Sequence, residues 1–107
     1  MIALAYKYFE AWNSNNIENL RPLFSEDIIL TDWDINASGI EDVLIANKNI
    51  FDSVVGIKAQ VIDIAASSTD KVFAKLIIEI SPELSLTVID VLTIEHNKIK
   101  RIDAYKQ

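Results

Sequence analysis

Three polar residues lie at positions where the surrounding pattern calls for apolar side chains: Tyr8, Asp32 and Asp90. Such residues are informative because a local rule is broken without an evident gain in packing. A carboxyl group among aliphatic side chains either meets a cation or keeps its proton, and a protonated carboxyl donates a hydrogen bond. A buried phenol likewise needs a partner for its hydroxyl group.

Asp90 lies in the middle of the better core face of a predicted strand. No Lys or Arg shares that face, so the strand itself offers no cation that could pair with an ionised Asp90. Two interpretations stay open: an aspartate at the edge of the core that reaches water or caps a loop, and an acid kept protonated in an apolar pocket. The alternation that defines the face runs through Leu84, Leu86, Val88, Asp90, Leu92 and Ile94.

Tyr8 and Asp32 each have a plain structural alternative. Tyr8 is central in the apolar stripe of a helix, where a core aromatic with its hydroxyl at the rim is the simpler interpretation. Asp32 lies near the end of a strand, either at the mouth of a pocket or at the start of a turn with Asp34. These two aspartates share one side and could bind a cation together, but two carboxylates without a third ligand are a weak metal signal.

Helices are predicted first along the chain. Apolar residues spaced for one helical face predict a helix over residues 1–13. Asn15 with Glu18 fits a capping box for a short second helix through Phe24, which Pro22 should kink or end early. Asp27–Trp33 alternates as a strand, Asp34–Gly39 is predicted as a loop, and a third helix is predicted over Ile40–Val54.

Four strands are predicted after Gly56, where the hydrophobic period changes to two. Their short, turn-like connections favour an antiparallel meander, so the chain is predicted as one α+β domain spanning residues 1–107 with helices on one face of the sheet. His96 falls in a two-residue hairpin turn with Asn97 and is expected to be exposed. The strands are Ile57–Ala66, Lys71–Ser81, Leu84–Glu95 and Lys98–Tyr105.

Composition narrows the function classes. A formal net charge of −6 argues against nucleic acid and against anionic membrane surfaces as partners. The chain has no cysteine, which excludes disulfides, thiol nucleophiles and thiolate metal sites. No apolar run approaches a membrane span, and the apolar N-terminus is interrupted too early for a signal peptide, so a cytoplasmic location is expected.

The order of motifs resembles that of ketosteroid isomerases, SnoaL-like polyketide cyclases and other nuclear-transport-factor-2-like proteins. The resemblance covers nearly the whole chain. It implies an α+β barrel-like fold, in which a cone-like curved antiparallel sheet wraps around N-terminal helices and encloses a pocket. The segments that carry it are Tyr8–Leu20, Leu23–Asp27, Gly39–Val43, Val88–Asp90 and Lys98–Tyr105.

The resemblance also implies roles for the three polar residues. Tyr8 and Asp90 match the phenol and the protonated acid that hold a developing enolate oxygen, and Asp32 matches the general base. The implied reaction abstracts and returns a proton next to a carbonyl of a small hydrophobic substrate, and it needs no metal or organic cofactor. Residues expected to contact the substrate are Trp12, Trp33, Asn47 and Phe51.

Departures from the isomerases favour a second interpretation. Trp33 stands where the isomerases usually have proline, the following loop is two residues shorter, and Asn47 replaces a supporting tyrosine. Epoxide hydrolases of this fold use an Asp-Arg-Asp set, and the position two residues before Asp90, where that arginine would stand, is Val88. The alternative is therefore a non-catalytic module of the same fold that binds a small ligand or forms a dimer.

The second face of the strands predicts an interface. Ile89 and Val91, with Phe73 and Ile77 on the neighbouring strand, leave an apolar patch on the outside of the sheet, and such patches mark interfaces. Because homodimers through the sheet are usual in proteins that this chain resembles, a homodimer is expected.

Overall fold

The structure, a computed structural model, describes every residue from Met1 to Gln107. Its first helix, α1 (Ile2–Asn13), presents the predicted apolar stripe to the core. Met1, which the predicted helix over residues 1–13 includes, lies before the first helical turn and is exposed. The buried residues of α1 are Leu4, Ala5, Tyr8, Phe9 and Trp12.

Two short 3-10 helices, η1 (Ile17–Asn19) and η2 (Arg21–Leu23), follow α1. The predicted interruption at Pro22 is therefore confirmed, because no continuous second helix forms. The predicted cap at Asn15 is wrong, since the side chain of Asn16 accepts the hydrogen bond from the Glu18 backbone N–H. Asn15 instead adopts a left-handed backbone with φ 54°.

Two asparagine side chains attach the end of α1 to the start of β3 (Lys58–Ala66). The Asn13 amide donates to the Ala59 carbonyl oxygen at 2.9 Å and accepts from the Ala59 N–H at 2.7 Å, as a neighbouring strand would. The Asn15 amide donates to the carbonyl oxygens of Ile57 and Trp12. These bonds fix the rotation of α1, and with it the direction of the side chains in its last two turns.

The sheet has six strands in the order β2-β1-β6-β5-β4-β3. The predicted antiparallel meander of the last four strands is confirmed. The sheet is nevertheless not purely antiparallel, because β1 pairs with β6 in parallel. The remaining strands are β1 (Phe24–Thr31), β2 (Asn36–Ser38), β4 (Lys71–Ser81), β5 (Leu84–Glu95) and β6 (Lys98–Lys106).

Two predicted boundaries change. The first strand begins at Phe24 and ends before Asp32, so Asp32 itself lies in the turn that follows. The predicted loop over residues 34–39 contains β2, which pairs antiparallel with β1. Gly39 then takes φ 89°, a left-handed conformation that suits glycine, and α2 (Ile40–Ser53) begins at the predicted residue.

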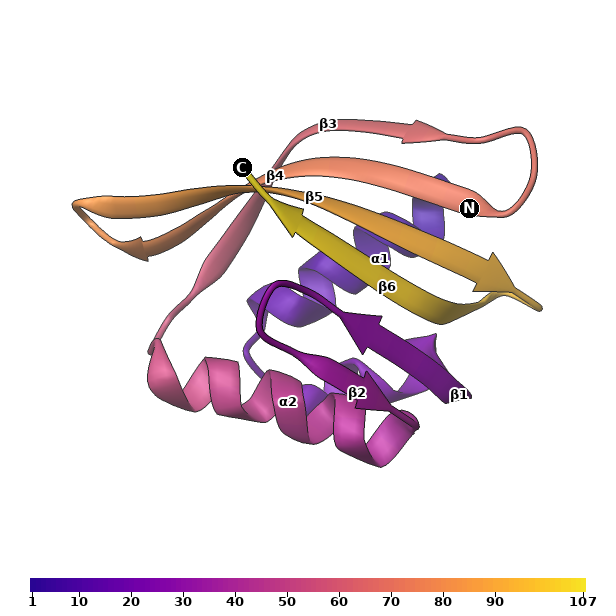
Figure 1. Ribbon diagram of the computed structural model, residues 1–107, viewed down its shortest axis with the longest axis horizontal. Coiled ribbons are helices and arrows are strands. Elements are labelled where there is room, and N and C mark those ends of the chain that lie inside the picture. The colour runs from indigo at the N-terminus through magenta and orange to yellow at the C-terminus, as the bar shows by residue number, and fades with distance from the viewer.

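The sheet curves around the helices without closing on itself (Figure 1). Bulges in β3, β4 and the β5–β6 pair bend the strands. Because β2 and β3 are both edge strands, the sheet is an open cone and not a closed barrel. Helix α1 lies against the concave face, and α2 runs across the lower end beside β1 and β2. No helix is long and apolar enough to cross a membrane.

Candidate active site

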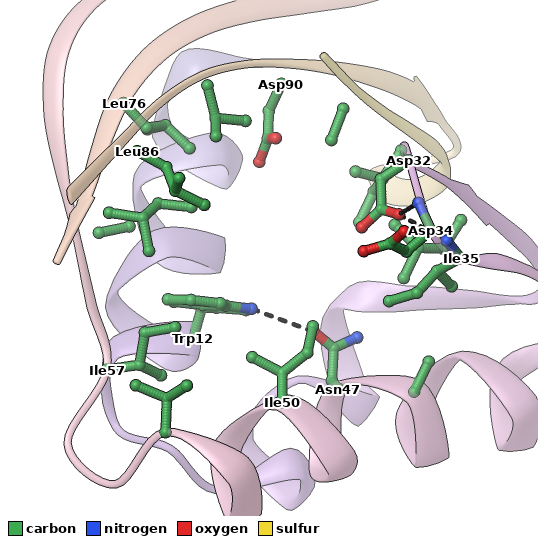
Figure 2. A pocket seen from close by; sticks show the side chains of 18 of the residues that line it. Trp12, Asp32, Asp34, Ile35, Asn47, Ile50, Ile57, Leu76, Leu86 and Asp90 are labelled. Carbon is green, nitrogen blue, oxygen red and sulfur yellow. Dashed lines mark hydrogen bonds between the residues drawn. The ribbon is translucent and has the colours of Figure 1, made fainter. Parts of the chain in front are cut away.

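A cavity of about 440 Å³ opens between the concave face of the sheet, α1, α2 and the turn between β1 and β2. Its size falls in the range of small-molecule sites. Most of the wall is hydrophobic, and the few polar side chains converge from different elements, as Figure 2 shows. Strands β4 and β5 supply the aliphatic side of the wall through Leu76, Ile78, Ile80, Leu86 and Val88.

Asp90 points into this cavity from the centre of β5 (Figure 2). Its cross-strand neighbours are Ala74 on β4 and Ala104 on β6, whose small side chains leave open space beside the carboxyl group. The residue is 7% exposed, and no group in the chain donates a hydrogen bond to it. No fully enclosed polar atom lacks a partner, so the carboxyl oxygens are open to the cavity.

Burial raises the pKa of Asp90 to about 7, and the negative charge of Asp32 contributes to the shift. Burial acts because the charged form loses its hydration, and the nearby carboxylate acts by repulsion between like charges. A substantial part of the protein therefore has Asp90 protonated at neutral pH. Of the two interpretations left open by the sequence, the structure agrees with the acid in an apolar pocket.

Tyr8 lies on the same cavity from α1 and is buried among aromatic rings. Its ring centroid is 5.1 Å from that of Phe9 and 5.9 Å from that of Phe24. Burial, and secondly the charge of Asp90, raise the pKa of the Tyr8 phenol well above its ordinary value. The phenol therefore stays neutral and able to donate, and no group in the chain accepts its proton.

Asp32 combines the two roles that its position predicted. Its Oδ1 accepts hydrogen bonds from the backbone N–H groups of Asp34 at 2.7 Å and Ile35 at 2.6 Å, which closes the turn between β1 and β2. The second oxygen, Oδ2, has no hydrogen-bond partner in the chain. Figure 2 shows the carboxylate directed into the cavity, beside that of Asp34.

Asp34 is a cavity residue that sequence reasoning assigned only to a turn or to a metal pair. It lies two residues after Asp32, and the tight turn directs both carboxylates into the mouth of the cavity. The spacing of two residues was the signal in the sequence that could have indicated this. No group of three or more His, Cys, Asp or Glu side chains is placed to hold a metal ion.

The four residues expected to contact a substrate separate into three on the cavity wall and one behind it. Trp12, Trp33 and Asn47 line the cavity. Phe51 does not, because it packs edge-on against the indole of Trp12 with ring centroids 5.3 Å apart. Trp33 lies at the mouth, and the Lys106 ammonium is 5.3 Å from its ring centroid.

Asn47 supports Trp12. The Trp12 Nε1–H donates to Asn47 Oδ1 at 3.0 Å, and the Asn47 amide donates to the Val43 carbonyl oxygen at 2.9 Å. Both side chains are buried, and their polar atoms satisfy each other. Asn47 therefore fixes the indole that forms one wall of the cavity (Figure 2).

The sequence matches the model of the SnoaL-like domain over residues 5–102. The chain therefore belongs to the SnoaL-like domain family. No curated protein matches it.

Solved structures share the fold at low sequence identity. A proposed ketosteroid isomerase from Kribbella flavida has a TM-score of 0.85 and 19% identity, with 98% of this chain and 76% of that chain covered. A proposed polyketide cyclase from Sinorhizobium meliloti has a TM-score of 0.86 and 18% identity, with 95% of this chain and 93% of that chain covered. A nuclear-transport-factor-2-like protein of unknown function from Cytophaga hutchinsonii has a TM-score of 0.82 and 13% identity, with 97% of this chain and 87% of that chain covered. These similarities establish the fold, which hosts proteins of different function.

Proposed function

We propose that this protein is a cofactor-independent enzyme of the isomerase or cyclase type, which acts on a small hydrophobic carbonyl compound. It removes a proton from the carbon next to the carbonyl and returns it to the resulting enolate. The observation that carries the proposal is the buried, unpartnered carboxyl of Asp90, open to an apolar cavity and with a pKa raised to about 7. Burying such a group costs stability, and groups of this kind are typical of functional sites.

Three side chains share the proposed reaction. The neutral phenol of Tyr8 and the protonated carboxyl of Asp90 donate hydrogen bonds to the substrate carbonyl, and these bonds strengthen as negative charge develops on that oxygen. The free oxygen of Asp32 takes the proton from carbon and later gives it back. The aliphatic wall excludes water, which strengthens each of these interactions.

The test is exchange of hydrogen for deuterium at the carbons beside the carbonyl of 2-decalone, followed by NMR. The wild-type protein should accelerate the exchange over buffer, and Asp32→Asn should lose roughly a hundredfold or more of that acceleration, as is usual for loss of a general base. Asp42→Asn removes the same charge from the exposed surface of α2 and serves as the control. Equal exchange by Asp32→Asn and wild type would refute the role of Asp32.

A second candidate function is binding without reaction. It is favoured by the hydrogen bonds of Asp32, since a side chain that closes a turn has a structural reason to be present. In that case hydrophobic ketones bind in the cavity and the wild-type protein exchanges no deuterium above the buffer rate. Calorimetric titration of 2-decalone alongside the exchange experiment separates the two functions.

We also propose that two copies associate through the convex face of the sheet. Phe73 on β4, Ile89 on β5 and Tyr105 on β6 lie exposed on that face, and the register places Tyr105 directly opposite Ile89. Together with Ile77 and Val91 they form an apolar surface that a second copy would cover.

A further inference from the structure

The ionisable groups that line the cavity carry charge of one sign. Asp32, Asp34 and Asp90 contribute carboxyl groups, and Tyr8 contributes a phenol that stays neutral. No Lys, Arg or His lines the cavity. Lys106 lies over the ring of Trp33 at the mouth and does not line the cavity. Any ligand therefore meets a negative potential in a site partly removed from water.

One of these carboxyl groups is buried without a partner in the chain. Asp90 is 7% exposed, is directed into the cavity and has no hydrogen bond or ion pair in the chain. Asp34 is equally without a side-chain partner at the mouth, and one oxygen of Asp32 is free. No group of three or more His, Cys, Asp or Glu side chains is placed to hold a metal ion, and an organic cation would complement the charge of these carboxylates.

We infer that the cavity selects its ligands by charge: it binds hydrophobic compounds that carry a protonated amine more tightly than neutral analogues, and it rejects carboxylates. The inference deepens the proposed function, on which it rests, by naming the class of substrate that the site accepts. The hydrocarbon part of the ligand packs on the aliphatic wall of β4 and β5. The ammonium group lies toward the carboxylate of Asp34 at the mouth, which leaves the free oxygen of Asp32 to act as the base.

The same arrangement links amine binding to pH. The titratable groups that face Asp90 are Tyr8 on α1 and Asp32 and Asp34 in the turn after β1; the residues of α2, β3, β4 and β6 that line the cavity are not titratable. Asp90 titrates near neutrality, with a pKa of about 7. An ammonium ion favours the ionised form of Asp90, so amine affinity should increase several-fold from pH 6 to pH 8 as that proton is lost, whereas the proposed reaction, which uses the protonated form, should slow over the same range.

Three compounds of one shape test the inference: 1-adamantylamine, 1-adamantanol and 1-adamantanecarboxylate. Isothermal titration calorimetry at pH 8 should give a dissociation constant for the amine at least roughly tenfold below that of the alcohol, since one favourable charge interaction in a partly buried site is worth that much. The carboxylate should not bind measurably. Asp34→Asn should weaken the binding of the amine, whereas Asp42→Asn, which removes an exposed charge outside the cavity, should leave it unchanged.

The outcomes distinguish this inference from the proposed reaction. Equal affinity for the amine and the alcohol, binding of the carboxylate as tight as that of the amine, or failure of all three to bind would overturn the inference. Amine selectivity without deuterium exchange of 2-decalone would leave the charge selection standing and refute the enzyme. Deuterium exchange without amine selectivity would refute the charge selection alone.

Discussion

The carboxylate of Asp32 and the buried carboxyl of Asp90 lie on the same cavity, and the charge of the first helps to keep the proton on the second. The two groups come from different parts of the sheet, Asp32 from the turn after β1 and Asp90 from the centre of β5. Environments that separate the proton affinities of two carboxyl groups are how one site provides both an acid and a base.

Tyr8→Phe should weaken the binding of 2-naphthol, a phenol that imitates an enol. Loss of one hydrogen bond in an apolar site lowers affinity roughly tenfold, and Asp90→Leu should have an effect at least as large. Fluorescence or calorimetric titration measures both. Tyr6→Phe is the matched control, because it removes a hydroxyl from the exposed side of the same helix. If Tyr8→Phe and Asp90→Leu both bind 2-naphthol like wild type, the two donors do not act on the ligand.

Asp90 should make the protein less stable as the pH rises. Its pKa is near 3.8 in the unfolded chain and about 7 in the folded protein, so the folded state holds the proton more tightly. Stability from this group is fully present below pH 4, is lost between pH 4 and pH 7, and changes no further above that range. The free energy of unfolding should fall by about 4 kcal/mol across that range through this group alone.

The effect of Asp90 is isolated by comparison with Asp90→Asn, which cannot ionise. Urea denaturation of both proteins at pH 4 and pH 7 gives the difference in their stabilities at each pH. That difference should move by several kcal/mol in favour of Asp90→Asn at the higher pH. A difference in stability that stays constant with pH would mean that folding does not shift the pKa of Asp90.

Asn47→Leu should destabilise the fold by about 1–3 kcal/mol, because it leaves the buried Nε1–H of Trp12 without an acceptor. It should also loosen the indole, which a change in tryptophan fluorescence would report. Lys48→Ala, one residue along the same helix, removes only an exposed ion pair with Asp52 and should cost about 0.5 kcal/mol or less. Equal losses in the two variants would contradict the role assigned to Asn47.

Ile89→Lys should convert a dimer into a monomer, because it replaces an apolar contact with a charge directly opposite that of Lys75. Sedimentation velocity at micromolar concentrations measures the change. Ile45→Lys is the control, since Ile45 is an exposed apolar residue of α2 away from the sheet. A wild-type protein that sediments as a monomer under these conditions would refute the proposed interface.

The strand pattern predicted the part of the site that depends on a regular period. Alternation along residues 84–95 placed Asp90 among buried aliphatic residues, and the helical stripe placed Tyr8 and Trp12 on the inner face of α1; the structure agrees with both. These predictions succeeded because a face of a strand or helix repeats along the chain. A single residue that breaks the repeat is then visible without any knowledge of the tertiary structure.

Features that depend on non-local contacts were not predictable in this way. The strand β2 has only three residues, too few to show a period, and the sequence predicted a loop there. Phe51 shares the inward face of α2 with Asn47, yet the edge-on contact with Trp12 removes it from the cavity wall. The cap at Asn16 differs from the predicted one by a single residue, because Asn15 is used to bind Ile57 across the chain.

The parallel pairing of β1 with β6 has a consequence for how the protein folds. Ile29 lies beside Arg101, so β1, an early strand in the chain, can pair with β6 only after the last strand has formed. Contacts between such distant parts of a chain slow folding, since a long loop must close before they form. The hairpins of the meander can assemble earlier, with Asp90 already among them. Asp32 joins it only when β6 has docked between their strands, so acid–base competence is expected to appear at the end of folding.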